Sequence, residues 1–340
     1  MTEHALRPSV ALIYQQQNEN AEHGASLDVV RLPSTTPATF SVGRERNCMT
    51  KTSLLVLCLL LVLGCNTTTD KLSQRQEPFA FGVIADIQFA DKDTRGDRHY
   101  RESLDKLKEC VEELNRRKLA FTIQLGDLID GNNTPEKTLA DLNSVLEVYN
   151  TLSMPRYHVV GNHCLTAGRE ELHERLGLSS FYYDFTVPSA QGWRFVVLDG
   201  NDAGYGVLGA NQLEWLRSKL AEARANQEKV ILFNHYALLN SAAQYCRMTT
   251  PEPVLQLINE SDCVVAYFAG HDHLGGYALQ DGIHHVTVKG MVDTPTRNAY
   301  AVISVSPTKL EETGFGREPS REMKQQAQPR AESDGLKPAP

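Results

Sequence analysis

The stretch Phe79-Ala80-Phe81-Gly82-Val83-Ile84-Ala85-Asp86-Ile87-Gln88 decides the fold of this chain of 340 residues. Residues 79–85 form a continuous apolar run, which is typical of a strand buried on both faces of a parallel sheet. The run ends directly at a carboxylate, Asp86. In α/β proteins the ligand site lies outside the carboxyl ends of the strands. The stretch therefore predicts an α/β fold with a functional site that begins at Asp86.

Four more predicted strands, at residues 119–125, 156–160, 230–233 and 263–269, end in the same way. Short polar clusters follow them: Gly126-Asp127, Gly161-Asn162-His163, Asn234-His235 and Gly270-His271. Parallel strands bring their carboxyl ends to one edge of a sheet, so we expect these clusters to converge. One such residue would mean little, but five strand ends of this kind are difficult to explain by packing.

Helical patterns separate these strands. Apolar residues with helical spacing run from Tyr100 to Leu114, and Thr134-Pro135 resembles the start of a second helix. Asn211 and Glu214 resemble a capping box that opens a third. Further strands are expected at residues 181–187, 193–198, 276–279, 285–288 and 299–305. Strands that alternate with helices indicate the α/β class.

The strand-end residues are carboxylates, imidazoles and an amide. This donor set suits divalent manganese, iron, zinc or magnesium. No thiol belongs to it, and the seven cysteines include no C-x-x-C pair, so a zinc ribbon is not indicated. We expect Cys110, Cys164, Cys246 and Cys263 to be free and mostly buried. Gly161 and Gly270 precede expected ligands, where the absence of a side chain permits a sharp backbone turn.

The composition is that of an ordinary globular protein, with 41% hydrophobic and 22% charged residues. A formal net charge of -8 argues against a nucleic-acid partner, because nucleic-acid surfaces are usually basic. An anionic small-molecule substrate is not excluded, since bound metal ions supply positive charge locally.

The N-terminal part carries an apolar run at residues 54–63, too short for a membrane-spanning helix. It fits a secretory signal, and Leu63-Gly64-Cys65 resembles a bacterial lipobox. We expect translation to start at Met49 and Cys65 to be lipidated, which gives an exported, membrane-anchored lipoprotein of a bacterial envelope. A signal anchor with residues 1–48 on the cytoplasmic side is one alternative, and a cytoplasmic protein is another. The expected organisation is an irregular extension 1–48, a signal peptide 49–65, a polar tether 66–77, the main domain 78–323 and a disordered tail 324–340.

The polar clusters resemble the signature of the calcineurin-like metallophosphoesterases: D-x-H/Q, G-D-x-x-D, G-N-H, a lone His after a strand, and G-H-x-H. The corresponding segments here are Asp86-Ile87-Gln88, Gly126-Asp127-Leu128-Ile129-Asp130, Gly161-Asn162-His163, His235 and Gly270-His271-Asp272-His273. The resemblance implies a four-layer α/β/β/α sandwich with a dinuclear metal site at the carboxyl ends of the strands.

The resemblance also implies two divalent ions, preferably manganese, with iron, zinc or magnesium as alternatives. One ion would be held by Asp86, Gln88, Asp127 and His273, and the other by Asp127, Asn162, His235 and His271. Asp127 would bridge ions ~3.5–4 Å apart, and a hydroxide activated by both would attack phosphorus in line. His163 would be the non-ligand acid, and Asp130 would orient it.

A narrower resemblance is to the manganese-dependent ADP-ribose/CDP-alcohol diphosphatases, and Gln88, where most of the class has His, is its most specific residue. It continues through Tyr100-Arg101, residues 124–131, Phe268-Ala269-Gly270-His271, Gly275-Gly276-Tyr277 and Gly316-Arg317. This resemblance implies cleavage of the pyrophosphate bond in small nucleotide derivatives such as ADP-ribose and CDP-choline.

Two departures from that family keep alternatives open. Cys164 follows Gly-Asn-His where an acidic residue is usual, and residues 199–211 and 91–98 are short where the family has longer loops near the substrate. Because loops set specificity, a phosphomonoesterase or phosphodiesterase of another small ester is an alternative. A non-catalytic binding scaffold is a second alternative, although every expected ligand is present.

Overall fold

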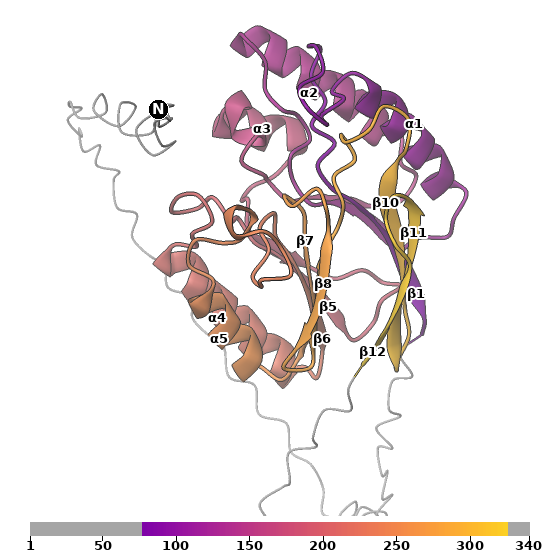
Figure 1. Cartoon of the computed structure of the whole chain (residues 1–340). Coiled ribbons are helices and arrows are strands. Elements are labelled where there is room, and N and C mark those ends of the chain that lie inside the picture. Colours follow the sequence, from indigo (N-terminus) through magenta and orange to yellow (C-terminus); the bar gives the residue numbers. More distant parts are fainter. Residues whose placement is uncertain (1–76, 326–340) are drawn as a thin grey trace, which may run out of the picture. The chain divides into compact units, whose positions relative to one another are not determined.

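The computed structural model describes residues 77–325 (Figure 1). The expected extension 1–48, the signal peptide with Cys65, the tether up to residue 76 and the tail from residue 326 lie outside the described residues. Lys324, which was expected to belong to the tail, is the last residue of strand β12 (Arg321–Lys324). Within residues 77–325, no helix is long and apolar enough to cross a membrane.

The first sheet has six strands in the order β12-β11-β10-β1-β2-β3. Strand β1 pairs in parallel with β2, and β2 pairs in parallel with β3, while β10, β11 and β12 are antiparallel to their neighbours. The carboxyl ends of β1, β2 and β3 therefore lie at one edge. The bounds are β1 Phe79–Ile84, β2 Phe121–Gln124, β3 Arg156–His158, β10 Ala299–Val305 and β11 Lys309–Gly316.

The second sheet also has six strands, in the order β4-β5-β6-β7-β9-β8. Its central strands β5, β6, β7 and β9 are parallel, and the antiparallel strands β4 and β8 form the edges. The bounds are β4 Tyr183–Phe185, β5 Trp193–Val197, β6 Lys229–Phe233, β7 Val264–Ala269, β8 Gly276–Gln280 and β9 Ile283–Thr287. The segments 181–187 and 193–198, both expected to be strands, contain β4 and β5, which pair with each other.

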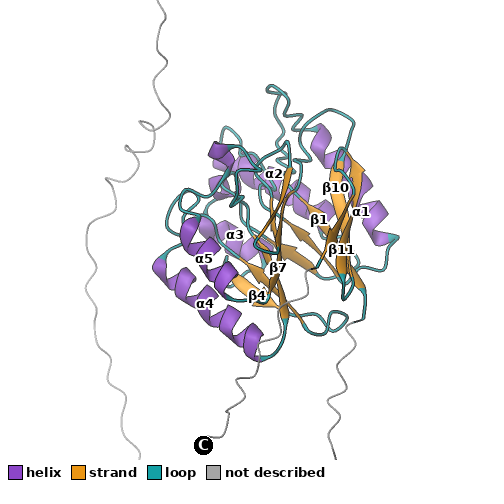
Figure 2. Ribbon diagram, turned by 60° about the horizontal axis from the view of Figure 1, so that its bottom comes forward, coloured by secondary structure: helices purple, strands orange, loops and turns teal. Residues whose placement is uncertain are grey.

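The two sheets pack face to face (Figure 2). Aromatic and aliphatic side chains fill the core between them. The Phe81 ring from the first sheet stacks on Phe121 at 4.8 Å between centroids and meets Phe233 and Phe268 of the second sheet edge-on at 5.9 Å. Residues 79, 81, 83 and 85 of the β1 segment face this core, and residues 80 and 84 face the helices. The continuous apolar run at residues 79–85 is explained, because both faces of β1 are buried.

Helices cover the outer face of each sheet (Figure 1). Helices α1 (Glu102–Asn115), α2 (Pro135–Tyr149) and α3 (Arg169–Leu176) lie on the first sheet, and α4 (Ala210–Ala225) and α5 (Glu252–Glu260) on the second. The layers run helix, sheet, sheet, helix, which confirms the predicted α/β/β/α sandwich. The predicted start of α2 is also confirmed, because the Thr134 hydroxyl accepts a hydrogen bond from the Lys137 amide.

Other local predictions differ from the structure. The capping box at Asn211 is wrong: α4 begins at Ala210, and Gly209 precedes it without a capping side chain. Helices α3 and α5 and the strands β11 and β12 were not predicted. Helix α3 is mostly polar and buries a single residue, Leu172, so it has too few apolar positions to show a helical period. Strand β12 is the edge of the first sheet and β11 is its neighbour, and each buries a single apolar residue, Met323 and Leu310 respectively, which is too few to show a period.

Two glutamates are buried where β11 pairs with β12. The side chains of Glu312 and Glu318 are inaccessible to solvent, and both interact with Arg321, whose Nε lies 2.5 Å from Glu312 Oε2. Burial and the neighbouring Glu318 raise the pKa of Glu312 to about 8, against the opposing effect of Arg321. Burial also raises the pKa of Glu318. The folded pair therefore retains a proton that an unfolded chain would release.

This proton makes stability depend on pH. Because the folded state binds more protons than the unfolded state, we expect the free energy of unfolding to fall as pH rises from about 4.5 to about 8. One proton contributes at most about 1.4 kcal/mol per pH unit. In the Glu312→Gln variant the amide replaces the protonated acid, so this part of the pH dependence should disappear. Urea unfolding between pH 5 and pH 8.5 measures the difference from the wild type.

The matched control is Glu311→Gln, on the same strand but on its exposed face. This variant should keep the pH dependence of the wild type. Equal slopes for Glu312→Gln and the wild type would contradict a proton held by the buried pair.

Candidate metal centre

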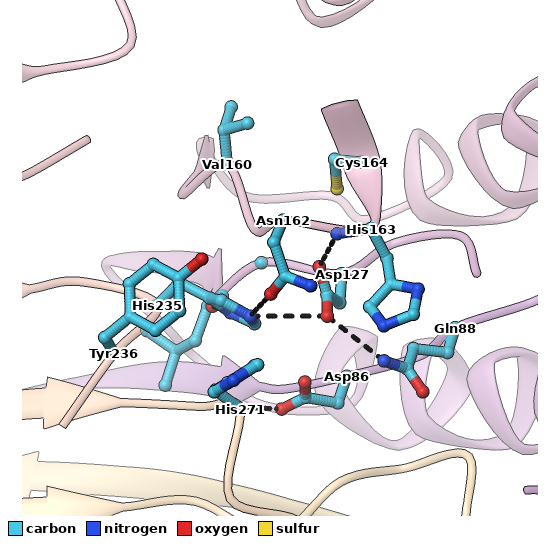
Figure 3. Close-up of polar contacts among 12 residues, drawn as sticks. Asp86, Gln88, Asp127, Val160, Asn162, His163, Cys164, His235, Tyr236 and His271 are labelled. Carbon is cyan, nitrogen blue, oxygen red and sulfur yellow. Dashed lines mark hydrogen bonds and ion pairs between the residues drawn. The ribbon is translucent and has the colours of Figure 1, made fainter. Parts of the chain in front are cut away.

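The carboxyl ends of five strands from both sheets converge on one polar cluster (Figure 3). Strand β1 leads to Asp86, β2 to Asp127, β6 to His235 and β7 to His271. One potential ligand atom from each of these four residues lies within 4.8 Å of the other three. Strand β3 adds Asn162, whose Oδ1 lies 3.1 Å from His235 Nε2. The polar residues that follow these five strands are far apart in the sequence, and they lie together in the structure as predicted.

The backbone at these strand ends adopts an uncommon conformation. Asp86, Gln88, Asp127 and His271 have positive φ angles of 49°, 42°, 52° and 67°. Residues other than glycine rarely occupy this left-handed region, at a cost of about 1–3 kcal/mol each, and such strain concentrates at functional sites. The left-handed turns redirect the chain directly after each strand, while hydrogen bonds such as Gln88 N–H to Asp127 O hold it in place.

The Asp127 carboxylate is the centre of the cluster. It is fully buried, and it accepts hydrogen bonds from the His163 amide at 2.8 Å and from Gln88 Nε2 at 3.1 Å (Figure 3). His235 Nε2 lies 3.3 Å away. Burial opposes ionisation of Asp127, but His235, His163 and His271 outweigh it and hold the pKa of this carboxyl far below its usual value. Asp127 therefore brings a full negative charge to the cluster.

His235 is fixed by the backbone of the first sheet. Its Nδ1 lies 2.8 Å from the carbonyl oxygen of Leu125, which can only accept, so Nδ1 carries the donated proton. Nε2 is then directed at Asp127 and Asn162. Burial lowers the pKa of His235, but the Asp127 carboxylate exceeds this effect and raises it to about 9. The geometry is that of a histidine prepared to bind a cation through Nε2.

Two buried oxygen atoms in the cluster accept no hydrogen bond from any described residue: Asp86 Oδ1 and Gln88 Oε1. Asp86 uses its other oxygen to accept from the His271 amide at 2.9 Å, and Gln88 uses its amide nitrogen to donate to Asp127. Buried polar atoms without a partner are rare and need an explanation. Oxygen atoms arranged around carboxylates and imidazoles suit a hard or borderline divalent cation, so the residues present fit a metal site.

His273 approaches the cluster from the same loop as His271. Its Nε2 lies 3.5 Å from Asp86 Oδ1, and its Nδ1 lies 2.8 Å from a carboxylate oxygen of Asp293. Burial lowers the pKa of His273, but Asp293 and Asp86 outweigh this and raise it to about 10. Asp293 was missed in the sequence. It lies several residues beyond the end of β9 (Ile283–Thr287), so the strand-end pattern does not mark it.

His163 lies beside the cluster, with a quarter of its side chain exposed. Its Nδ1 lies 3.0 Å from the Asp130 carbonyl and 3.2 Å from Asp130 Oδ1. Arg98 NH1 contacts the same Oδ1 at 3.0 Å, and Lys92 contacts Oδ2. Asp130 is thus held by two cations while it faces His163. The expected proximity of His163 and Asp130 is observed.

Cys164, which stands where related sequences usually have an acidic residue, supports the loop of Asp127. Its buried Sγ accepts a hydrogen bond from the Leu128 amide at 3.3 Å, which supports the loop that carries Asp127. All four cysteines of the described body are free and buried, as predicted.

The role expected for Gly161 and Gly270 needs a correction. Neither has a positive φ, so a sharp left-handed turn is not their function. A Cβ at Gly161 would overlap Asp127 Oδ1, and one at Gly270 would lie 2.8 Å from Asp86 Oδ2. The carboxylates pack directly against these backbones, and this close approach requires glycine.

Tyr205 was also missed. It comes from the loop between β5 and α4, and its hydroxyl contacts His271 Nε2. No periodicity or motif in the sequence marks this position, because the contact is made between two loops.

Comparison with known proteins identifies relatives of this fold and site. Residues 79–275 match the model of the calcineurin-like phosphoesterase family. The chain is 32% identical over 295 residues to a protein of Oryza sativa named manganese-dependent ADP-ribose/CDP-alcohol diphosphatase, with 70% of this chain and 91% of the relative covered. It is 30% identical over 318 residues to a Homo sapiens protein of the same name, with 72% and 92% covered. A dimetal phosphatase crystal structure from Danio rerio superimposes with a TM-score of 0.66 at 26% identity, covering 74% of this chain and all of that one.

The expected localisation is contradicted by these relatives. They come from plants and vertebrates, such as Oryza sativa, Arabidopsis thaliana and Homo sapiens. The prediction of an exported, membrane-anchored lipoprotein of a bacterial envelope is therefore wrong. It depended on a short apolar run before Cys65, and such a run indicates only local hydrophobicity, which by itself specifies neither export nor lipidation.

The pairing of Asp293 with His273 predicts an effect on metal affinity. In Asp293→Ala, His273 loses the acceptor that fixes its ring and its protonated nitrogen, so manganese should bind roughly 10–100-fold more weakly. Asp293→Asn should have a smaller effect, because its amide oxygen still accepts the hydrogen bond. Titration calorimetry of manganese into metal-stripped protein measures both variants.

Asp281→Ala, which changes an exposed aspartate in the turn between β8 and β9, is the matched control and should bind manganese like the wild type. Wild-type affinity in Asp293→Ala would show that His273 does not depend on Asp293.

Proposed function

The chain belongs to the calcineurin-like phosphoesterase family, and from that premise we propose that it hydrolyses the pyrophosphate bond of small nucleotide derivatives such as ADP-ribose and CDP-alcohols. The observation that carries the hydrolytic part is the cluster of Asp86, Asp127, His235 and His271, whose ligand atoms lie within 4.8 Å of one another. The substrate class is supported by the name that the curated relatives share over 70–72% of this chain.

We assign two divalent ions, preferably manganese, to this centre. One would be held by Asp86, Gln88, Asp127 and His273, and the other by Asp127, Asn162, His235 and His271. Asp86 Oδ1 and Gln88 Oε1, which accept no hydrogen bond from a described residue, support the first set. The orientation of His235 Nε2 beside Asn162 supports the second. Asp127 lies between both sets, with Oδ2 near Gln88 and His235.

Two ions bound here would supply a water molecule of lowered pKa and positive charge for the phosphoryl oxygens. The protein contributes further positive charge from Lys92 and Arg98, which face a single carboxylate, Asp130. Together with bound metal ions, these two cations would attract an anionic phosphate although the whole chain carries a formal charge of -8.

His163 is the proposed acid. Its Nδ1 faces Asp130, so its Nε2 is the nitrogen available to give a proton to the leaving phosphate oxygen. Asp130 keeps the ring in this orientation. The His163 backbone amide donates to Asp127 Oδ1, which fixes the acid relative to the central carboxylate.

Hydrolysis by the full chain tests this function. The metal-stripped protein, given manganese or magnesium, should cleave ADP-ribose and CDP-choline in the presence of manganese, with p-nitrophenyl phosphate as the simple ester for comparison. Activity confined to p-nitrophenyl phosphate or to cyclic nucleotides would identify a phosphomonoesterase or phosphodiesterase instead. Absence of activity with every metal would leave a binding scaffold as the explanation.

His163→Ala should lower kcat about 10²–10⁴-fold, the usual contribution of a positioned acid. Metal binding should remain unchanged, because alanine keeps the backbone amide that donates to Asp127. Steady-state kinetics and metal analysis of the same preparation separate the two effects.

His173→Ala is a control outside the cluster, since His173 lies on α3 and its Nδ1 contacts the backbone carbonyl of Leu178, just past the end of that helix. This variant should keep the wild-type kcat. A His163→Ala enzyme with undiminished turnover would remove His163 from the mechanism.

A further inference from the structure

The loop that joins β5 to α4 is held next to the metal centre. Gly204 and Gly206, with φ angles of 128° and 65°, allow the chain to turn on both sides of Tyr205. The Thr249 hydroxyl donates to the Tyr205 carbonyl at 2.7 Å, and the Thr249 amide donates to the Gly206 carbonyl at 2.9 Å. The backbone of Tyr205 is therefore held on the loop that follows β6.

The Tyr205 side chain reaches His271, one of the four clustered ligands. Its ring is edge-on to Tyr236 at 4.8 Å and to His271 at 5.7 Å between centroids. Its hydroxyl contacts His271 Nε2 and also lies 3.1 Å from the carbonyl oxygen of Tyr245. These contacts orient the imidazole from outside the cluster, while the His271 amide is bonded to Asp86 Oδ2 from inside.

The order of donors in this chain of contacts determines which nitrogen of His271 carries a proton. A carbonyl oxygen can only accept, so the Tyr205 hydroxyl donates its one proton to Tyr245. Towards His271 the hydroxyl oxygen can then only accept, and Nε2 must be the donor. In a neutral imidazole this arrangement leaves Nδ1 without a proton.

We propose that Tyr205 is a positioning residue for the metal centre, which fixes the ring and the tautomer of His271 so that Nδ1 binds the second ion. This inference rests on the proposed ligand set. Partners of this kind, which hold the remote nitrogen of a ligating histidine, usually affect metal affinity 10–100-fold. Tyr205 thus connects the β5–α4 loop to the ion assigned to Asp127, Asn162, His235 and His271.

Tyr205→Phe tests the proposal, because it removes only the hydroxyl and keeps the ring that packs on Tyr236. In calorimetric titrations of manganese into the metal-stripped full chain, one of the two sites should bind about 10-fold more weakly. The other site should be unchanged. Circular dichroism and thermal unfolding of the same samples should match those of the wild type.

Tyr245→Phe is the matched control, because Tyr245 takes part through its backbone carbonyl, which the substitution retains. It should bind manganese like the wild type. Unchanged manganese affinity at both sites of Tyr205→Phe would overturn the inference. If turnover were lost while the affinity stayed unchanged, the hydroxyl would act on the substrate instead of the metal centre. If the wild type itself bound no manganese, the proposed function would fail, which is a distinguishable result.

Discussion

The buried charge of Asp127 is the constraint on which the site depends. A carboxylate without solvent is costly unless it is paired and hydrogen-bonded, and here the partners come from both sheets. Gln88 and His163 approach from the first sheet, and His235 approaches from the second. The packing of the sheets therefore has to bring groups from the ends of three strands to within about 3 Å of the two Asp127 carboxylate oxygens, which is the ordinary hydrogen-bond distance. The aromatic core beneath the site supplies the rigid contact between the sheets that maintains this geometry.

The histidines of the site follow one rule with different partners. Each has one nitrogen held by a group outside the cluster, which directs the other nitrogen inwards or towards the substrate. His235 uses the Leu125 carbonyl, His273 uses Asp293, His271 uses Tyr205 and His163 uses Asp130. Since a histidine can bind a cation or transfer a proton only from a nitrogen of defined protonation, these outer partners are as important to the chemistry as the ring nitrogens themselves.

Two loops, at residues 91–98 and 199–211, lie against this rigid centre. Arg98 in the first loop contacts Asp130, and Tyr205 in the second contacts His271. Both loops are therefore in direct contact with residues of the site. Because loops on a rigid scaffold commonly set specificity, we expect these two to connect substrate choice with metal binding.

The sequence by itself determined the α/β class, most of the strands and the set of residues that converge, because buried strands are continuous apolar runs and Asp86, Asp127, His235 and His271 follow their ends; the sandwich was implied only by the family resemblance. It could not indicate α3, β11 or β12, whose few buried residues leave no clear period. Only the tertiary structure placed Asp293 behind His273 and Tyr205 behind His271. Those contacts join loops that are distant in sequence, and their geometry depends on how the two sheets pack rather than on any local pattern.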